Sequence, residues 1–240
     1  MKTILLKFAG PLQAWGTSSH FETRHTDFYP SKSAVIGIVA ASLGYRRDEN
    51  NKITRLNELD FAVRVDQQGT LLRDFHIAKK YKDSGEMERN YVTNRYYLED
   101  AVFVIALSHE DEQFLQEILE ALKAPYFQTF MGRRALPLTA DFILGETEVG
   151  ALESLQNLQW QAASWYMKKQ RSSGEISLEI YIDNHLLDKE AYQLRQDKVL
   201  SFSQKGRGFG FRYEARELVN VQNPYQDKNT EHDIFESIGD

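Results

Sequence analysis

The pattern of apolar and polar positions over the first 44 residues predicts a strand, a polar loop and a helix. Thr3 to Phe8 is a short apolar run, and Gly10 and Pro11 after it both interrupt regular structure. The residues that follow have no apolar period as far as Pro30, which predicts a presented loop. The chain therefore opens with a strand that leads into an exposed connection.

Residues 33 to 43 predict a helix, because Ser31 is a good N-cap and the segment is almost uncharged. Its side chains separate by size into two nearly opposite stripes, a bulky one of Ile36, Val39 and Leu43 and a small one of Ala34, Gly37, Ala41 and Gly44. A helix that is apolar all round is expected to lie between two layers. We therefore expect the small stripe to serve close packing.

Two extended segments come next in the sequence. Residues 60 to 66 alternate apolar and polar positions, and residues 71 to 78 continue in extended form, so together they predict a hairpin. Residues 79 to 98 are rich in Lys, Arg and Tyr without a consistent period. This segment predicts an insertion that leaves the main sheet.

A strand, a helix and a further strand are predicted after this insertion. The apolar run 101 to 107 predicts a buried strand, and Ser108 is placed to cap the amphipathic helix that ends at Pro125. A further strand is predicted at 142 to 144. The order is βαββαβ, which predicts an α+β fold of the ferredoxin-like type with two helices on one sheet face. The other face is left free, as in domains that bind single-stranded RNA there.

The composition changes near residue 150 toward Gln, Ser and polar alternation, with strands predicted at 176 to 182 and 217 to 221. We therefore predict two domains. Residues 1 to 148 form the ferredoxin-like domain, and residues 149 to 240 form a smaller β-rich domain.

Composition and charge restrict the function. The net charge of −6 argues against a generic basic nucleic-acid binder, but residues 1 to 47 carry six Lys or Arg against two acids. Zero cysteines exclude disulfides and thiolate metal sites. The longest apolar run, residues 34 to 43, is shorter than the ~20 residues that cross a bilayer, so no membrane partner is expected.

The sharpest candidate site is the first turn of the predicted helix. Lys32 and Ser33 lie where free backbone N–H groups and the helix dipole favour an anion, so a phosphate there would gain a cation and a hydroxyl. A solvated first turn is the plain alternative. The pair resembles the end of a Walker A motif, but no GxxxxG precedes it, which disfavours nucleotide hydrolysis.

Other candidates lie in the loops. In the first loop, Gln13, Trp15 and Gly16 predict an RNA-binding surface, although Trp15 is equally explained as a core residue or as a base-stacking one. Arg24, in the same loop, is a candidate for phosphate contact because its guanidinium is always charged and can donate two parallel hydrogen bonds to a phosphate.

The segment after Gly132 adds Arg133 and Arg134, of which we expect one to meet RNA and the other a carboxylate inside the fold. GRGFGFRY at 206 to 213 matches five positions of an RNA-binding motif, but it lacks the required strand context and predicts a flexible loop that can still touch a partner.

Five sequence blocks occur in the order found in one known family: FAGPLQAWG at 8 to 16, YPSKSAVIGIVAASLG at 29 to 44, RDFH at 73 to 76, YLEDAVFVIAL at 97 to 107 and GRRALPLT at 132 to 139. Through these blocks the chain resembles the CasD proteins, the fifth CRISPR-associated family, in their type I-E form. The C-terminal part is similar only through Arg216 and Glu217 before an apolar strand.

The resemblance implies a RAMP-superfamily protein with an RRM-like domain that acts in the cytoplasm as a subunit of Cascade, the antiviral surveillance complex. Such a subunit binds RNA, is not an enzyme and needs no cofactor. Its implied partners are the 5′ handle of the CRISPR RNA, the CasC backbone subunit and the large CasA subunit. Target DNA is met indirectly, because the guide reads it by base pairing.

The resemblance also implies that the insertion at about 77 to 98 is a thumb that crosses the nucleic-acid strands. Its candidates for contact with nucleic acid or other subunits are Lys79, Lys80, Tyr81, Arg89 and Arg95. The alternative for each is an ordinary mobile loop.

Two other functions remain open. A related subunit of type I-C systems cleaves repeat RNA without metal, which requires a base, an acid and a cation near one phosphate. Tyr45, Lys32 and His76 form the plausible trio for such an endoribonuclease. The second alternative is a ferredoxin-like module whose basic N-terminal face binds an acidic protein.

Overall fold

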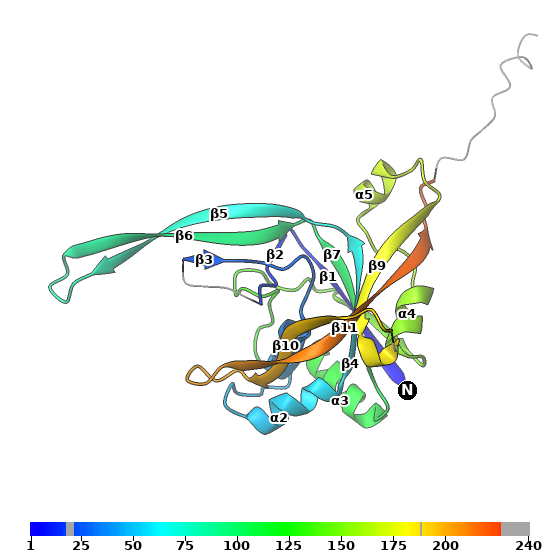
Figure 1. Ribbon diagram of the computed structural model, residues 1–240, viewed down its shortest axis with the longest axis horizontal. Coiled ribbons are helices and arrows are strands. Elements are labelled where there is room, and N and C mark those ends of the chain that lie inside the picture. The colour runs from blue at the N-terminus through cyan, green and yellow to red at the C-terminus, as the bar shows by residue number, and fades with distance from the viewer. Residues whose placement is uncertain (18–21, 188, 227–240) are drawn as a thin grey trace, which may run out of the picture.

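The computed structural model describes residues 1–17, 22–187 and 189–226 (Figure 1). Its main unit is a seven-stranded sheet in which all neighbouring strands are antiparallel. In spatial order the strands are β10 (Gln193–Ser201), β11 (Gly208–Gln222), β9 (Glu175–Asp183), β4 (Asp60–Gln67), β7 (Val102–His109), β1 (Lys2–Ala9) and β8 (Ile143–Thr147). The protein is a sheet-rich α+β chain, as the sequence predicts.

The strands and helices predicted in the first 145 residues are present. Helix α1 (Lys32–Ser42) connects β1 to the region of β4, and α3 (Glu112–Lys123) connects β7 to β8. The N-cap of α3 is Asp111, whose side chain accepts the N–H of Phe114, whereas Ser108 is buried inside β7 and bonds Thr3. The predicted capping role of Ser108 is therefore wrong. None of the described helices combines the length and the apolar character needed to cross a membrane.

Both faces of the central strands are buried, because alternate residues along a strand point to opposite sides. On one side, strand residues such as Ile4, Leu6 and Phe103 form the main core with apolar residues of α1 and α3. On the other side, Leu5 and Val104 pack in a second cluster that includes residues of α4 (Ala151–Asn157). The expectation of a free sheet face for RNA is therefore wrong, since α4 covers it.

The C-terminal segment has no sheet of its own among its described residues. Strand β9 pairs with β4, so β9, β11 and β10 extend the N-terminal sheet at one edge. The short helix α5 (Ser164–Lys169) precedes β9. The predicted second domain from residue 149 therefore shares the sheet of the first. Local alternation predicted the strands but carries no information about which edge they join.

A second sheet carries a long hairpin away from the body of the protein, to the left in Figure 1. It consists of β5 (Thr70–Tyr81) paired with β6 (Met87–Glu99), and β6 also pairs with the short strands β2 (Leu12–Gln13) and β3 (Thr23–Arg24). Residues 71 to 78 therefore pair with β6, and the predicted hairpin with residues 60 to 66 is wrong. The remaining elements are α2 (Asn50–Arg55) and the 3₁₀ turns Leu56–Glu58 and Asn184–Leu186.

Candidate nucleic-acid interface

A groove with a volume of about 1370 Å³ lies between α1, the loop 127–135, the base of the β5–β6 hairpin and the β10–β11 hairpin. Its described lining contains no Asp, Glu or Lys, but it contains one histidine, His25, and seven arginines: Arg24, Arg46, Arg47, Arg95, Arg133, Arg134 and Arg207. The chain as a whole has a net charge of −6. Positive charge is thus concentrated at this concave surface, where it favours an anionic ligand.

The floor of the groove is the small-residue stripe of α1. Ala34, Gly37 and Ala41 are partly exposed and line the groove, while the bulky residues Ile36 and Val39 are buried in the core. The expectation that this stripe serves close packing is therefore corrected. Aromatic rings surround the floor, from Tyr45, Tyr97, Phe127, Phe130, Phe202 and Phe209. An apolar floor surrounded by arginines is suited to a ligand that has both flat apolar groups and anionic groups.

Arg133 is held against the backbone of the neighbouring strands. Its Nη2 donates to the carbonyl oxygens of Arg24 (3.1 Å) and Tyr96 (3.0 Å), and its guanidinium lies 4.1 Å from the ring centre of Tyr97. The predicted internal carboxylate partner is absent from its described contacts, and carbonyls take that place. Arg133 Nη1 and Arg95 Nε are buried without a hydrogen-bond partner. Both residues line the groove, although these two nitrogen atoms themselves are covered by the protein.

Two neighbouring arginines, Arg134 and Arg24, are more exposed to solvent than Arg133. Arg134 and Arg24 are exposed and line the groove, so both keep the phosphate-contact role that the sequence predicts as an expectation.

The turn that presents Arg133 depends on Gly132. This residue has φ +82°, and a Cβ added to it would overlap the carbonyl oxygen of Ala14. Gly85, at the tip of the β5–β6 hairpin, has almost the same backbone angle, φ +83°, but a Cβ there would meet nothing. The two glycines form a matched pair that separates backbone strain from a steric clash.

We expect Gly132→Ala to lower the free energy of unfolding by about 3 kcal/mol, because strain and a backbone clash add. Gly85→Ala carries the strain alone and is expected to cost about 1 kcal/mol. Urea denaturation of both variants measures the difference. Equal losses would show that the loop accommodates a side chain against Ala14.

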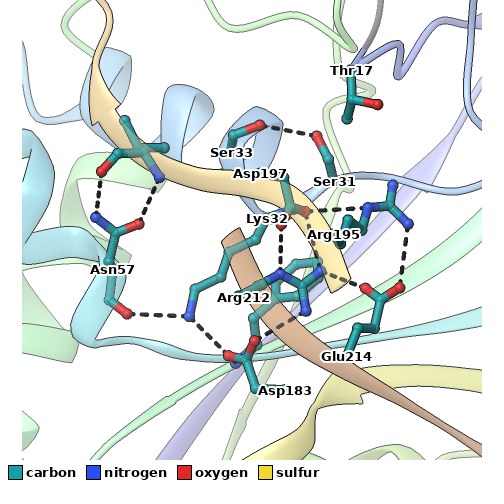
Figure 2. A network of polar contacts seen from close by, with 12 residues as sticks. Thr17, Ser31, Lys32, Ser33, Asn57, Asp183, Arg195, Asp197, Arg212 and Glu214 are labelled. Atoms are coloured by element: carbon teal, nitrogen blue, oxygen red, sulfur yellow. Dashed lines mark hydrogen bonds and ion pairs between the residues drawn. The ribbon is translucent and has the colours of Figure 1, made fainter. Parts of the chain in front are cut away.

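Lys32 is buried and is not among the residues that line the groove. Figure 2 shows its side chain directed toward Asp183 and Asn57. Its side chain donates to Asp183 Oδ2 (2.8 Å) and to the carbonyl oxygen of Asn57 (3.1 Å), and the residue is only 6% exposed. Its backbone N–H donates to Asp197 Oδ2 (2.8 Å). The prediction that Lys32 binds an RNA phosphate is therefore wrong, because the anions at this helix start belong to the chain itself.

Ser31 caps α1 as predicted, by accepting the N–H of Ala34. Ser33 is partly exposed, lines the groove, and lies 3.2 Å from Ser31, measured between the two hydroxyl oxygens. It stays a candidate for ligand contact.

Trp15 and Gln13 are core residues. Trp15 is 1% exposed, lies against the ring of Phe8 at 5.5 Å between centroids, and donates its Nε1 to Gln13 Oε1 (3.0 Å). Gln13 in turn donates to the carbonyl oxygens of Ala101 (2.8 Å) and Phe8 (3.2 Å). The core reading of Trp15 is correct, and the RNA contact predicted for the Gln13 side chain is wrong. Gly16 is exposed at the groove and keeps its predicted role as an expectation.

The five candidates in the predicted thumb separate into two groups. Arg95 lies at the base of the β5–β6 hairpin and lines the groove. The other four are exposed on the distal part of the hairpin: Lys79, Lys80, Tyr81 and Arg89. Of these, Lys80 pairs with Glu88 at 2.9 Å, and the Arg89 guanidinium lies 4.3 Å from the ring centre of Tyr91.

Three groove arginines were not predicted as site residues. Arg46 and Arg47 follow α1, and the excess of basic residues in positions 1 to 47 was the signal that pointed to them. Arg207 belongs to the glycine-rich segment, in which β11 begins at Gly208. The predicted flexible loop is therefore wrong from that residue on, since the strand context is present.

Comparison with known proteins gives consistent matches over most of the chain. The model of the family described as CRISPR-associated protein (Cas_Cas5) matches residues 3–213. The CRISPR system Cascade subunit CasD of Escherichia coli (strain K12) is 33% identical over 156 residues, which are 59% of this chain and 70% of that protein.

Two solved structures resemble the whole fold. A chain of a CRISPR RNA-guided surveillance complex has 28% identity and a TM-score of 0.77, with 95% of both chains covered. A crystal structure of a Cas protein has 28% identity and a TM-score of 0.63, with 95% of this chain and 98% of the other covered.

Proposed function

The chain belongs to the CRISPR-associated Cas5 family, and on that basis we propose that it is a non-catalytic RNA-binding subunit of a type I-E Cascade complex. In this proposal it holds the 5′ handle of the CRISPR RNA. It also connects the CasC backbone subunit to the large CasA subunit in the cytoplasm, and it meets target DNA only through the guide.

The observation that carries the proposal is the arginine-lined groove without described acidic residues. Single-stranded RNA needs cations at defined points along its backbone and apolar or aromatic surfaces for its bases. The groove offers both, because its arginines surround a floor of Ala34, Gly37 and Ala41 and several aromatic rings.

The topology supports the predicted domain type. Strands β8, β1, β7 and β4 are neighbours in that order, all antiparallel, with α1 and α3 in the connections that a βαββαβ unit requires. We interpret this part as the ferredoxin-like unit and the projecting β5–β6 hairpin as the thumb. Its exposed residues Lys79, Lys80, Tyr81 and Arg89 are suited to contact nucleic acid or a neighbouring subunit.

The endoribonuclease alternative is weaker, because the groove does not assemble the trio of side chains that it needs. Lys32 is buried against Asp183, and His76 pairs with Asp74 at 2.5 Å on β5. Only Tyr45 of the trio lines the groove. A holding function, which requires positive charge and shape without a base and an acid, fits these positions better.

The proposal is tested by mixing the purified chain with CRISPR repeat RNA in EDTA and following both binding and cleavage. We expect the RNA to be retained with an affinity that falls as salt increases, and to remain intact. A site-specific cut product would support the endoribonuclease. Loss of the RNA at moderate salt, both for the chain alone and together with CasC, would refute the RNA-binding function.

A further inference from the structure

A network of charged side chains fills the space between the start of α1 and the inner side of the β10–β11 hairpin (Figure 2). Three cations and three carboxylates that are buried or nearly so take part: Lys32, Arg195, Arg212, Asp183, Asp197 and Glu214. A fourth carboxylate, the partly exposed Asp27, pairs with Arg195 at 3.1 Å. Burying a charge lowers stability unless the charge is paired. We therefore asked what this arrangement of paired charges does in the fold.

Arg212 is the centre of this network. Its Nε and Nη2 donate to the two carboxylate oxygens of Asp197 (2.7 and 3.1 Å), and its Nη1 donates to Asp183 Oδ1 (3.0 Å). A further bond joins Arg212 Nη2 to Glu214. Burial lowers the pKa of the guanidinium, but Asp197 and Glu214 outweigh burial and raise it. The surrounding carboxylates therefore favour the charged form of Arg212.

The same carboxylates also hold α1. Asp197 accepts the backbone N–H of Lys32, and Asp183 accepts its ammonium group. Beside them the side-chain amide of Asn57 bonds both the N–H and the carbonyl oxygen of Val199 in β10 (3.0 and 2.8 Å). Two sets of contacts thus join the hairpin to the first turn of α1 and to the turn that follows α2.

The hairpin needs such an attachment. Strand β11 pairs with β9 only from Glu214 onward, so before that residue it pairs with β10 alone. A two-stranded ribbon is marginally stable in water without other contacts. This end, which no third strand pairs with, carries the second wall of the groove, with Arg207 and Phe209 at its edge. Apart from the ion pairs and Asn57, the buried Val199 and the rings of Phe202 and Phe209 hold it against the main core. Phe202 lies over the groove floor, because a Cβ on Gly37 would be 3.7 Å from its ring.

We propose that Arg212 and Asp197 are positioning residues that hold the β10–β11 hairpin against α1 and so set the place of the Arg207–Phe209 wall. The expected effect on RNA affinity rests on the proposed RNA-binding function. The expected effect on the position of the hairpin does not. Neither residue lines the groove, so they act on a ligand through the wall alone.

The test uses the double variant Arg212→Met/Asp197→Leu in the full chain. Removing both partners leaves Lys32 with Asp183 and Arg195 with Glu214, so no cation or carboxylate of the network loses its last partner. Replacement of a buried pair by apolar residues is often tolerated. The matched control is Arg216→Met/Glu179→Leu, which likewise replaces an arginine and its carboxylate partner by apolar residues, at a more exposed pair on β11 and β9.

Two readouts are needed. Because the sequence has no cysteine, spin labels at Glu117→Cys on α3 and Lys205→Cys in the hairpin report the distance between the core and the wall. Fluorescence anisotropy with a labelled single-stranded RNA of about ten nucleotides reports affinity. We expect the double variant to melt near the wild type, with a broadened distance distribution and about tenfold weaker RNA binding. The control is expected to match the wild type in both.

A distance distribution as narrow as that of the wild type would overturn the proposal, as would unchanged affinity with a broadened one. If the wild type itself fails to bind RNA while the distances broaden, the proposed function fails and the positioning role stands. Should the double variant not fold, Asp197→Asn keeps the shape and removes the charge. It is then expected to broaden the distances to a smaller extent, and an unchanged distribution would refute the role.

Discussion

Replacing Arg46 and Arg134 together with glutamate is expected to weaken binding of single-stranded RNA about a hundredfold. Both side chains are exposed in the groove. A hydrogen bond to a charged group contributes about 1.5 kcal/mol or more, so two lost phosphate contacts correspond to about 3 kcal/mol. The dependence of log affinity on log salt should also become less steep by about 1.4, since each phosphate contact on a single strand contributes about 0.7.

Anisotropy titrations at several salt concentrations measure both quantities. The control is Lys168→Glu/Lys169→Glu, which changes the net charge equally at two exposed positions on α5, outside the groove. Only general charge repulsion should act on the control. Equal losses in the two variants would mean that the groove is not the RNA site and that the total charge controls binding.

Replacing Arg64 with methionine is expected to lower the free energy of unfolding by about 3–5 kcal/mol. Arg64 is fully buried and pairs with Asp66, with Nε–Oδ1 and Nη2–Oδ2 distances of 2.7 and 2.8 Å. It also donates to the carbonyl oxygens of Leu155, Leu158 and Gln159 at and beyond the end of α4. Methionine leaves the Asp66 carboxylate buried without its cation and leaves three carbonyls without a donor.

Urea denaturation of Arg64→Met measures this loss. The control is Arg55→Met, at a side chain that is 57% exposed, and it should change stability by less than about 0.5 kcal/mol. The double variant Arg64→Met/Asp66→Leu should recover part of the loss, because the uncompensated carboxylate is removed as well. A loss below about 1 kcal/mol for Arg64→Met would show that water or a shift of α4 satisfies Asp66.

The candidate site was predictable in part. The excess of positive charge in residues 1 to 47, the paired arginines after Gly132 and the helix start at Ser31 all point to the region that the groove occupies. Individual roles were less predictable. The partner of the Lys32 ammonium, Asp183, is 151 residues away, and no local pattern shows that a lysine at a helix start will meet it.

Trp15 and Gln13 illustrate the same limit. Both lie in a segment without apolar period, which resembles an exposed loop, yet Gln13 bonds the carbonyl oxygen of Ala101, 88 residues away. A polar side chain becomes interior when distant backbone groups satisfy it. Trp15 lies in the interior because its Nε1 donates to this buried Gln13 and its ring contacts Phe8.

Local pattern was enough for the α+β class, for β1, α1, β7 and α3, and for the general place of the positive charge, because period and capping depend on residues close in sequence. Long-range contacts account for the rest. Pairing of β9 with β4 joins the C-terminal strands to the sheet, α4 closes its second face, and the attachment of the β10–β11 hairpin to α1 completes the groove. Strand partners and ion pairs are chosen among groups far apart in the chain, so they become known only when the chain is folded.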